Sequence, residues 1–191
     1  MRQIGLLLLA VLAISACQPA TTPTASPTQP PTTAPSPSAQ PGAQAIDASA
    51  FTKFGGCGDV YLWTTNADGT TAITVEWQGA ATAAWEDGGF DETSTLEEAP
   101  VLVSLVFGHG LDRLYCNDVI EPGMSEDNKV QADVGTVRLV VTPDEGGFKP
   151  ASHADATLTN LTFKVVVGTD EETWTLDELG FENLSVGWLA G

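Results

Sequence analysis

Residues 58–78 read GDVYLWTTNADGTTAITVEWQ and contain the clearest pair of β-strands in the chain. From Thr71 to Gln78, apolar and polar residues alternate, which is the pattern of a strand with one buried face. Gly58–Thr65 is a second, mostly apolar run. Between the two lies Asn66–Gly69 (NADG), a turn sequence, because Gly adopts positive φ and Asn and Asp bond to their own backbone. The stretch therefore predicts a β-hairpin.

Further strand-like segments follow this hairpin along the chain. Val101–Phe107 (VLVSLVF) is apolar on both faces, as a central strand would be. Thr95–Glu98 has the residues to cap one short helical turn, and no window shows a long helical period. The remaining strand candidates are Leu111–Cys116, Val134–Thr142, Ala156–Val167, Thr173–Leu176 and Leu184–Leu189.

About eight short strands, separated by Gly, Asp, Asn and Pro, predict an all-β domain. We expect an antiparallel β-sandwich and prefer an immunoglobulin-like arrangement. The sequence pattern of true immunoglobulin domains is not met, because Tyr115 precedes Cys116 by one residue instead of two.

The first 17 residues have the features of an export signal. Arg2 supplies a positive charge, and the apolar run Ile4–Ile14 is shorter than the roughly 20 residues that span a bilayer. The run ends in Leu12-Ala13-Ile14-Ser15-Ala16-Cys17, which resembles the lipobox of bacterial lipoproteins. The resemblance implies cleavage of residues 1–16 and attachment of diacylglycerol and a further acyl chain to Cys17. Two or three acyl chains anchor a protein stably, whereas one does not.

A Thr/Pro/Ser-rich segment follows the lipobox. Residues 18–45 contain no charged or aromatic residue and no aliphatic side chain larger than that of Ala. Such a segment buries too little apolar area to offset the entropy of ordering, so we expect it to be disordered. Its prolines favour an extended spacer of about 3.1 Å per residue. Residues 17–45 are therefore expected to be the lipid anchor and a stalk, with the folded domain at residues 46–191.

The expected domain is strongly acidic. All 25 acidic residues and six of the seven basic ones lie in it, so it carries 19 net negative charges. Nucleic-acid binding needs clustered Lys and Arg, which this domain lacks, and direct contact with anionic lipid is disfavoured for the same reason. The simplest interpretation is solubility. Divalent cations, a cationic partner and a salty habitat are the alternatives.

Two cysteines remain in the domain, Cys57 and Cys116. An even number in an oxidising compartment predicts a disulfide. It would close a loop of about 60 residues, worth roughly 4 kcal/mol in the chain-entropy model. A two-thiol metal or redox site is the alternative, but there is no C-x-x-C motif.

The domain has two histidines that could act as bases. His109 lies between two glycines at the end of an apolar strand, and His153 lies in a polar loop. No G-x-S-x-G or H-E-x-x-H motif accompanies them. A blue-copper site does not fit either, because no His follows Cys116 on the same loop.

Oxygen-rich loops suggest calcium as a speculative ligand. Calcium takes six to eight oxygen ligands from a chain that Gly allows to bend. The Glu86–Glu92 loop is the first candidate, with Asp87, Asp91 and Glu92 as ligands. Loops of an acidic protein without an ion would look the same.

Exposed tryptophans would suggest binding to sugar rings. Trp85 and Trp174 are the candidate ligand aromatics, whereas Trp77 lies on an apolar strand face and is assigned to the core.

Taken together, the sequence predicts a lipoprotein outside the cytoplasm, anchored through Cys17 to the cell membrane or an outer membrane. It would present a non-catalytic binding or structural module to an unknown protein or glycan, without nucleic acid or a required cofactor. The alternatives are a calcium-dependent adhesion or carbohydrate-binding module, and an envelope enzyme with His109 as its base.

Overall fold

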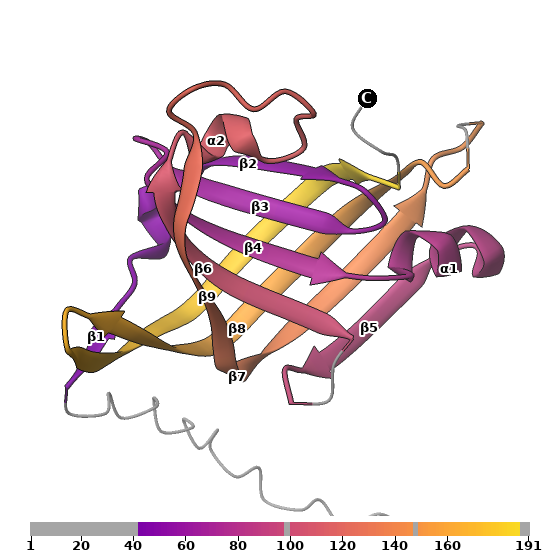
Figure 1. Cartoon of the computed structure of the whole chain (residues 1–191). Helices are drawn as coiled ribbons and strands as arrows, with labels where there is room; N and C mark the ends of the chain where they lie inside the picture. The colour runs from indigo at the N-terminus through magenta and orange to yellow at the C-terminus, as the bar shows by residue number, and fades with distance from the viewer. Residues whose placement is uncertain (1–41, 98–99, 147–148, 188–191) are drawn as a thin grey trace, which may run out of the picture. The chain divides into compact units, whose positions relative to one another are not determined.

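The computed structural model describes residues 42–97, 100–146 and 149–187, and these form an all-β domain (Figure 1). The fold class predicted from the sequence is thus confirmed. The predicted signal peptide, lipid anchor and most of the stalk lie outside the described residues. The strands are β1 (Ala43–Ala45), β2 (Phe51–Cys57), β3 (Tyr61–Asn66), β4 (Thr71–Trp77), β5 (Phe90–Thr95), β6 (Val101–His109), β7 (Ser125–Pro143), β8 (Ser152–Val167) and β9 (Asp170–Val186). Two short helices, α1 (Ala80–Asp87) and α2 (Leu111–Leu114), and a 3-10 turn (Ala48–Ala50) lie between them.

The hairpin predicted at residues 58–78 is confirmed. β3 and β4 pair antiparallel, with Leu62 opposite Val75. In the turn, the amide of Gly69 donates to the carbonyl of Asn66, 3.1 Å away. The side-chain oxygen of Asn66 accepts a hydrogen bond from the Thr70 amide at 2.9 Å. Gly69 has φ +66°, which glycine adopts without a steric cost, so the turn forms from the residues that predicted it.

The strands form one continuous mixed sheet in the order β1-β9-β8-β7-β6-β4-β3-β2, with β5 on β7. β1 runs parallel to β9, and the other described pairs are antiparallel. β7 joins the two parts of the sheet. Its first part, up to Gln131, pairs with β6, and from Ala132 onwards it pairs with β8. A sandwich of two separate antiparallel sheets, immunoglobulin-like or otherwise, is therefore not confirmed.

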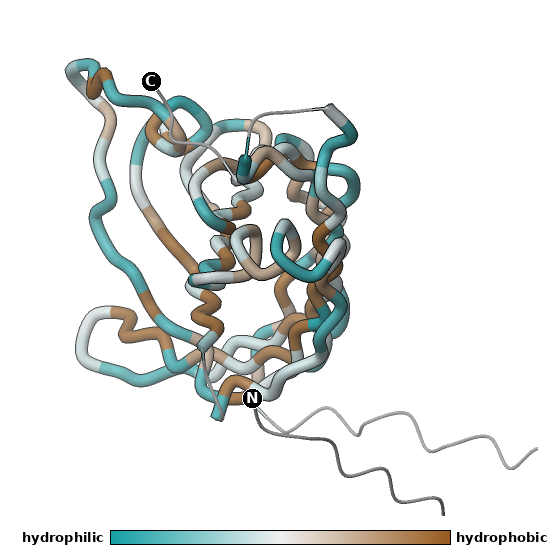
Figure 2. The backbone as a smooth tube through the Cα atoms, turned by 90° about the vertical axis from the view of Figure 1, so that its right-hand side faces the viewer, coloured by the Kyte–Doolittle hydropathy of each residue, from teal (hydrophilic) through white to brown (hydrophobic). Residues whose placement is uncertain are grey.

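The sheet curls so that a front half (β2, β3, β4 and β6) lies over a back half (β5, β7, β8 and β9) (Figures 1 and 2). Side chains from both halves form one core, including Leu62 and Ile73 from the front and Leu158 from the back. Each such fully buried side chain contributes roughly 1.5–3 kcal/mol. Trp77 is 2% exposed and its ring meets the edge of Phe90 at 5.5 Å, so its assignment to the core is confirmed.

β2 and β9 approach each other at one end of the curled sheet. The amide of Gly187 donates to the carbonyl of Gly58, and the ring of Phe54 meets that of Phe181 edge-on at 5.8 Å. A Cβ on Gly56 would lie 2.8 Å from the carbonyl oxygen of Ser185. Glycine at position 56 is thus required by this close approach.

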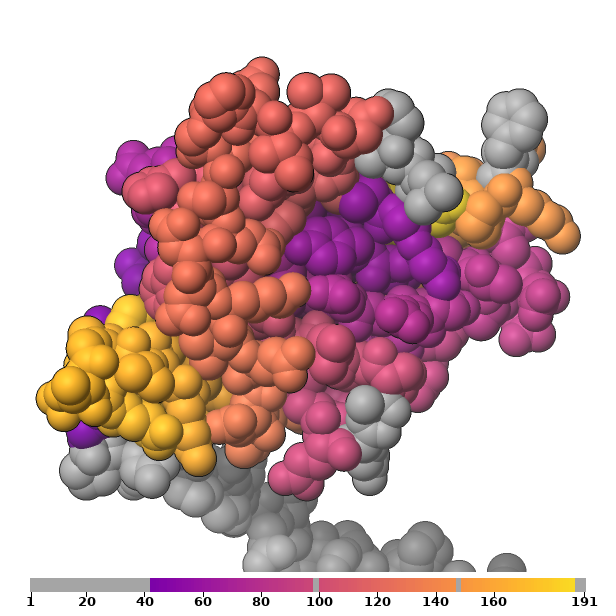
Figure 3. Space-filling model, viewed as in Figure 1, coloured from indigo at the N-terminus to yellow at the C-terminus, as the bar shows by residue number. Residues whose placement is uncertain are grey.

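Part of the outward face of the front half is covered by α2 and the residues after it (Figures 1 and 3). The ring of Tyr115 lies 5.7 Å from that of Tyr61 and 5.9 Å from that of Trp63. The strand predicted at Leu111–Cys116 is wrong, because residues 111–114 form α2. Gly110, with φ +60°, starts the helix, and Asp112 lies in its first turn, where a carboxylate interacts favourably with the helix dipole.

None of the described helices is both long enough and apolar enough to cross a membrane.

Candidate functional site

A surface groove lies where β7 crosses from the front half of the sheet to the back half. It has a volume of about 220 Å³ and is open to solvent. Its lining comes from β7, from β8, from the end of β5 and from the turn after β5: Thr95, Glu97, Val134, Gly135, Thr136 and Asn160. The lining is mixed, with two hydroxyls, one amide, one carboxylate and one aliphatic side chain. It is a small site with a mixed lining, below the roughly 300–1,000 Å³ of pockets for drug-sized ligands.

Irregular backbone in β7 and β8 creates this groove. The β7–β8 register shifts between Val134 and Thr136, so Gly135 is left out of the ladder. Gly135 has φ +144°, and a Cβ there would lie 2.3 Å from the Leu161 side chain and 3.1 Å from its Cα. Asn160 has φ +53°, an unusual conformation for a residue with a side chain. Such bulges bend strands and redirect side chains.

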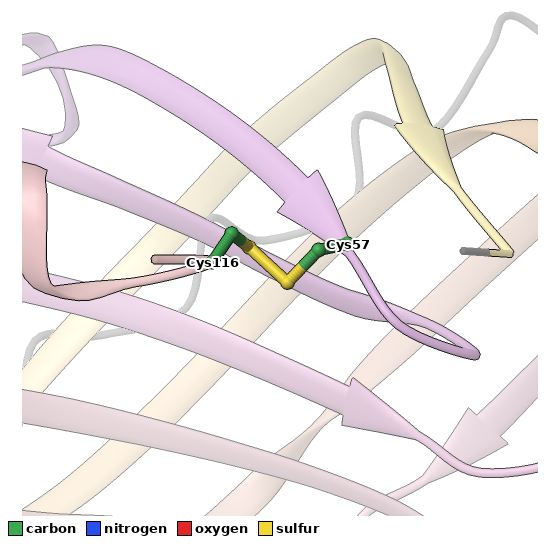
Figure 4. Close-up of a disulfide and its surroundings, with 2 residues drawn as sticks. All are labelled: Cys57 and Cys116. Atoms are coloured by element: carbon green, nitrogen blue, oxygen red, sulfur yellow. A yellow bond between two sulfur atoms is a disulfide. The ribbon is translucent and has the colours of Figure 1, made fainter. Parts of the chain in front are cut away.

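The predicted disulfide is confirmed. Cys57 ends β2, Cys116 follows α2, and their Cα atoms are 5.8 Å apart (Figure 4). The bond joins the edge of the front half to the segment that covers it. Both domain cysteines are therefore used, and neither is available as a metal ligand or a nucleophile.

His109, the candidate base, is at the end of β6 and strongly exposed. Its Nε2 lies 3.5 Å from a carboxylate oxygen of Asp127, and the hydroxyl of Ser125 donates to the same carboxylate at 2.8 Å. A nucleophilic hydroxyl would have to bond to the base itself. His153, the other histidine, has Nδ1 2.5 Å from an oxygen of Asp144.

The three calcium candidates are divided between two elements. Asp87 is the last residue of α1, and Asp91 and Glu92 lie in β5, where neighbouring side chains point to opposite faces. Both oxygens of Asp91 accept hydrogen bonds from Arg138, at 3.1 and 2.9 Å. This partner holds the pKa of Asp91 below its ordinary value. Within the described ranges, no group of three or more His, Cys, Asp or Glu side chains is placed to share an ion. Calcium binding at this loop stays a prediction.

The two candidate ligand aromatics are half-buried, and neither lines the groove. The indole N–H of Trp85 donates to the carbonyl of Ala151 at 2.8 Å, and the ammonium of Lys149 lies 5.7 Å from the ring centre. Trp174 donates to Glu172 at 3.0 Å and meets the ring of Phe107 edge-on. Ligand binding by Trp85 or Trp174 stays a prediction.

Comparisons with protein-family models, with curated proteins and with solved structures find no match. The function is therefore argued from this chain's own residues.

Nearly all the positive charge of the domain is already engaged. Five of its six basic residues form ion pairs: Lys53–Asp112, Arg113–Glu121, Lys129–Glu76, Arg138–Asp91 and Lys164–Asp133. The sixth, Lys149, lies over Trp85. Since 25 carboxylates face six cations, the surface left over is acidic, and it favours neutral or cationic partners over anionic ones.

Two tyrosines beneath the α2 cover are held neutral. Burial raises the pKa of the Tyr115 phenol well above its ordinary value, and the neighbouring carboxylate of Glu126 adds to the shift. Burial likewise raises the pKa of Tyr61. The rings of Tyr61, Trp63 and Tyr115 pack together against the front half of the sheet.

Sequence reasoning missed the groove. The local pointers were Gly135, which interrupts the alternation of β7, and Asn160, in the middle of a clear strand. Whether these two residues form a groove depends on which residues of β7, β8 and β5 are neighbours. That register cannot be predicted from one strand considered alone.

Proposed function

We propose that this protein is a lipid-anchored envelope protein whose stalk presents the acidic β-domain as a non-catalytic binding module. The lipobox-like segment Leu12–Cys17 and the Thr/Pro/Ser-rich residues after it support the anchor and the stalk. The observation that carries the proposal is the disulfide. Since Cys57 and Cys116 bond to each other, Cys17 is the one cysteine of the chain left for lipid.

The arrangement of the histidines supports binding over catalysis. Each lies beside one aspartate, and the hydroxyl of Ser125 donates to the aspartate of the His109 pair instead of to the histidine. The disulfide also fits an oxidising compartment outside the cytoplasm.

Lipid attachment is tested by metabolic labelling with an alkyne fatty acid in a bacterial host, followed by membrane fractionation. The wild-type chain should carry the label and sediment with membranes. Cys17→Ala should lose both properties. The matched control is the double variant Cys57→Ala/Cys116→Ala, which removes the other two cysteines and should keep the label. Equal labelling of wild type and Cys17→Ala would disprove the anchor.

Binding is tested on the same cells. Intact cells displaying the wild-type chain are compared with cells displaying a chain truncated after residue 45, by crosslinking to neighbouring envelope components. A component captured only in the presence of the domain supports the module. Turnover of a model substrate that His109→Ala abolishes would favour the enzyme instead.

A further inference from the structure

We propose that the groove at the β7 crossing is a binding site for one unit of a neutral carbohydrate. This inference rests on the proposed display function and names the class of ligand that the module would bind. It is carried by the shape of the groove, the chemistry of its lining and the charge around it.

The groove presents a pair of hydroxyl groups. The strand register places Thr95 opposite Thr136, and both line the groove. Thr159, opposite Thr136 on β8, lies next to this pair but is outside the lining. Threonine hydroxyls both donate and accept hydrogen bonds. A ligand bearing several hydroxyls of its own can therefore match this pair, whichever way each hydroxyl is turned.

An amide and a carboxylate complete the polar lining. The side chain of Asn160 offers two donors and an acceptor, and that of Glu97 offers acceptors only. The hydroxyl of Ser94 donates to the backbone carbonyl of Thr95. Within the described part of the chain, the side chains of Thr95, Glu97, Thr136 and Asn160 themselves make no hydrogen bond, so a ligand can bond to them. Hydrogen bonds that a site is built to make are the main source of its selectivity for hydroxyl-bearing ligands.

The apolar part of the lining suits the C–H face of a sugar ring. Val134 is 51% exposed, although valine side chains are usually buried. It lies beside the bulge at Gly135, whose missing side chain leaves the backbone of β7 close to β8. A ring that covers Val134 would remove its apolar surface from water while its hydroxyls bond to the threonines.

The charge of the groove excludes anions and does not favour cations. No basic residue is among the six described lining residues, and the domain carries 19 net negative charges. A carboxylated or sulfated sugar would be repelled. A cation would find a single carboxylate, Glu97, which in water gives only a weak attraction. A neutral ligand remains.

The size of the groove fits a single unit. Its volume of about 220 Å³ lies below that of pockets that enclose whole drug-sized ligands, so it has room for one ring and not for several. Because the groove is open, further units of a glycan can extend from it over the surface without entering it.

The first test is an NMR titration of the ¹⁵N-labelled mature chain from residue 17, with Cys17→Ser so that no lipid is attached. The neutral probes are glucose, galactose, mannose and N-acetylglucosamine, and the charged counterparts are glucosamine and glucuronate. We expect at least one neutral sugar to shift the amide resonances of Gly135, Thr136 and Asn160 saturably. No shift with any neutral probe overturns the proposal, as does a response to glucosamine alone. Shifts confined to the surroundings of Trp85 or Trp174 place the site elsewhere and also overturn it.

Two matched variants separate a ligand contact from a backbone effect. Asn160 and Asn183 have nearly the same left-handed conformation, with φ +53° and +52°, and only Asn160 lines the groove. Glycine relieves the backbone equally at both positions. We expect Asn160→Gly to weaken sugar binding about fivefold, the factor of one ordinary hydrogen bond, and Asn183→Gly to leave it unchanged. An equal effect of the two variants overturns the proposal.

The outcome is independent of the anchor. Failure of every sugar to bind leaves the fatty-acid labelling of Cys17 unaffected, and loss of labelling leaves the titration unaffected. The two proposals can therefore fail separately.

Discussion

The carboxylate of Asp59 accepts a hydrogen bond from the amide of Ala81, 3.0 Å away, across 22 residues of chain. The same carboxylate accepts hydrogen bonds from the amides of Gly79 and Thr82. Gly79, the residue at the N-terminal cap of α1, has no side chain to do this. Asp59, in the connection between β2 and β3, thus caps a helix that belongs to another part of the chain.

Asp59→Ala is therefore expected to destabilise the domain by about 1–2 kcal/mol, the usual cost of losing a helix cap. Urea unfolding followed by tryptophan fluorescence measures this. Asp68→Ala, in the exposed β3–β4 turn, is the control and should change stability by less than about 0.5 kcal/mol. Equal effects of the two variants would show that the cap contributes nothing.

Removing the disulfide is expected to cost about 4 kcal/mol, because Cys57 and Cys116 are 59 residues apart and the bond restricts the unfolded chain. The double variant Cys57→Ser/Cys116→Ser is compared with wild type by chemical denaturation. A loss below about 1 kcal/mol would mean that the α2 cover stays in place without the bond.

Replacing Thr64 by Val is expected to stabilise the domain by about 1 kcal/mol. Thr64 is fully buried, and its hydroxyl has no hydrogen-bond partner among the described residues. An unsatisfied buried hydroxyl costs about 1–3 kcal/mol, and Val has a similar shape and an equal preference for strands. Thr157→Val, at an exposed position on β8, controls for strand preference. A lower melting temperature for Thr64→Val would refute the expectation.

The ion pair between Lys53 and Asp112 should make stability depend on pH. The hydrogen bond from Lys53, at 2.7 Å, lowers the pKa of Asp112 from its ordinary 3.8, against the opposing effect of burial. A carboxyl with a lowered pKa stabilises the fold above its unfolded pKa, and this stability is lost as the pH falls through the folded pKa. Lys53→Met should therefore raise the pKa of Asp112 in a carboxyl-carbon NMR titration. It should destabilise the domain at neutral pH and have a smaller effect in acid.

Calcium is expected to give no more thermal stabilisation than magnesium. A Ca²⁺ ion at Asp91 would have to displace the guanidinium of Arg138 from both carboxylate oxygens. A specific site at a hundredfold excess of ion over Kd would stabilise by about 2.7 kcal/mol. Thermal melts with Ca²⁺, with Mg²⁺ and with matched NaCl distinguish a specific calcium site from the absence of one. A rise of that size with Ca²⁺ alone would support the Glu86–Glu92 loop as a calcium site.

Much of the fold was predictable because strands with one buried face alternate in sequence. β4 and the later part of β7 were found this way, and β6 was recognised as a central strand from apolar residues on both faces. The structure explains the last case, since Val106 on the outward face of β6 is buried under α2.

Other elements depend on partners far away in the chain. The first part of β7, from Ser125 to Gln131, is polar and reads as a loop, but its backbone pairs with β6. α1 is short and its cap comes from Asp59. β1 lies in the segment that the sequence assigned to the stalk. It was not predicted, because Ala43–Ala45 needs only backbone bonds to join β9. The groove likewise depends on distant partners, because it follows from the alignment of Gly135 with β8.

The three-residue β1 has a mechanical consequence. A pulling force applied through the chain before Ala43 reaches β1 first, and then the bond from the Ile46 amide to the Thr175 carbonyl. Releasing β1 lengthens the tether by about 10 Å, at roughly 3.4 Å per residue, and removes no side chain from the core. The long β8–β9 ladder behind it remains intact. The short parallel strand would thus yield before the rest of the domain does.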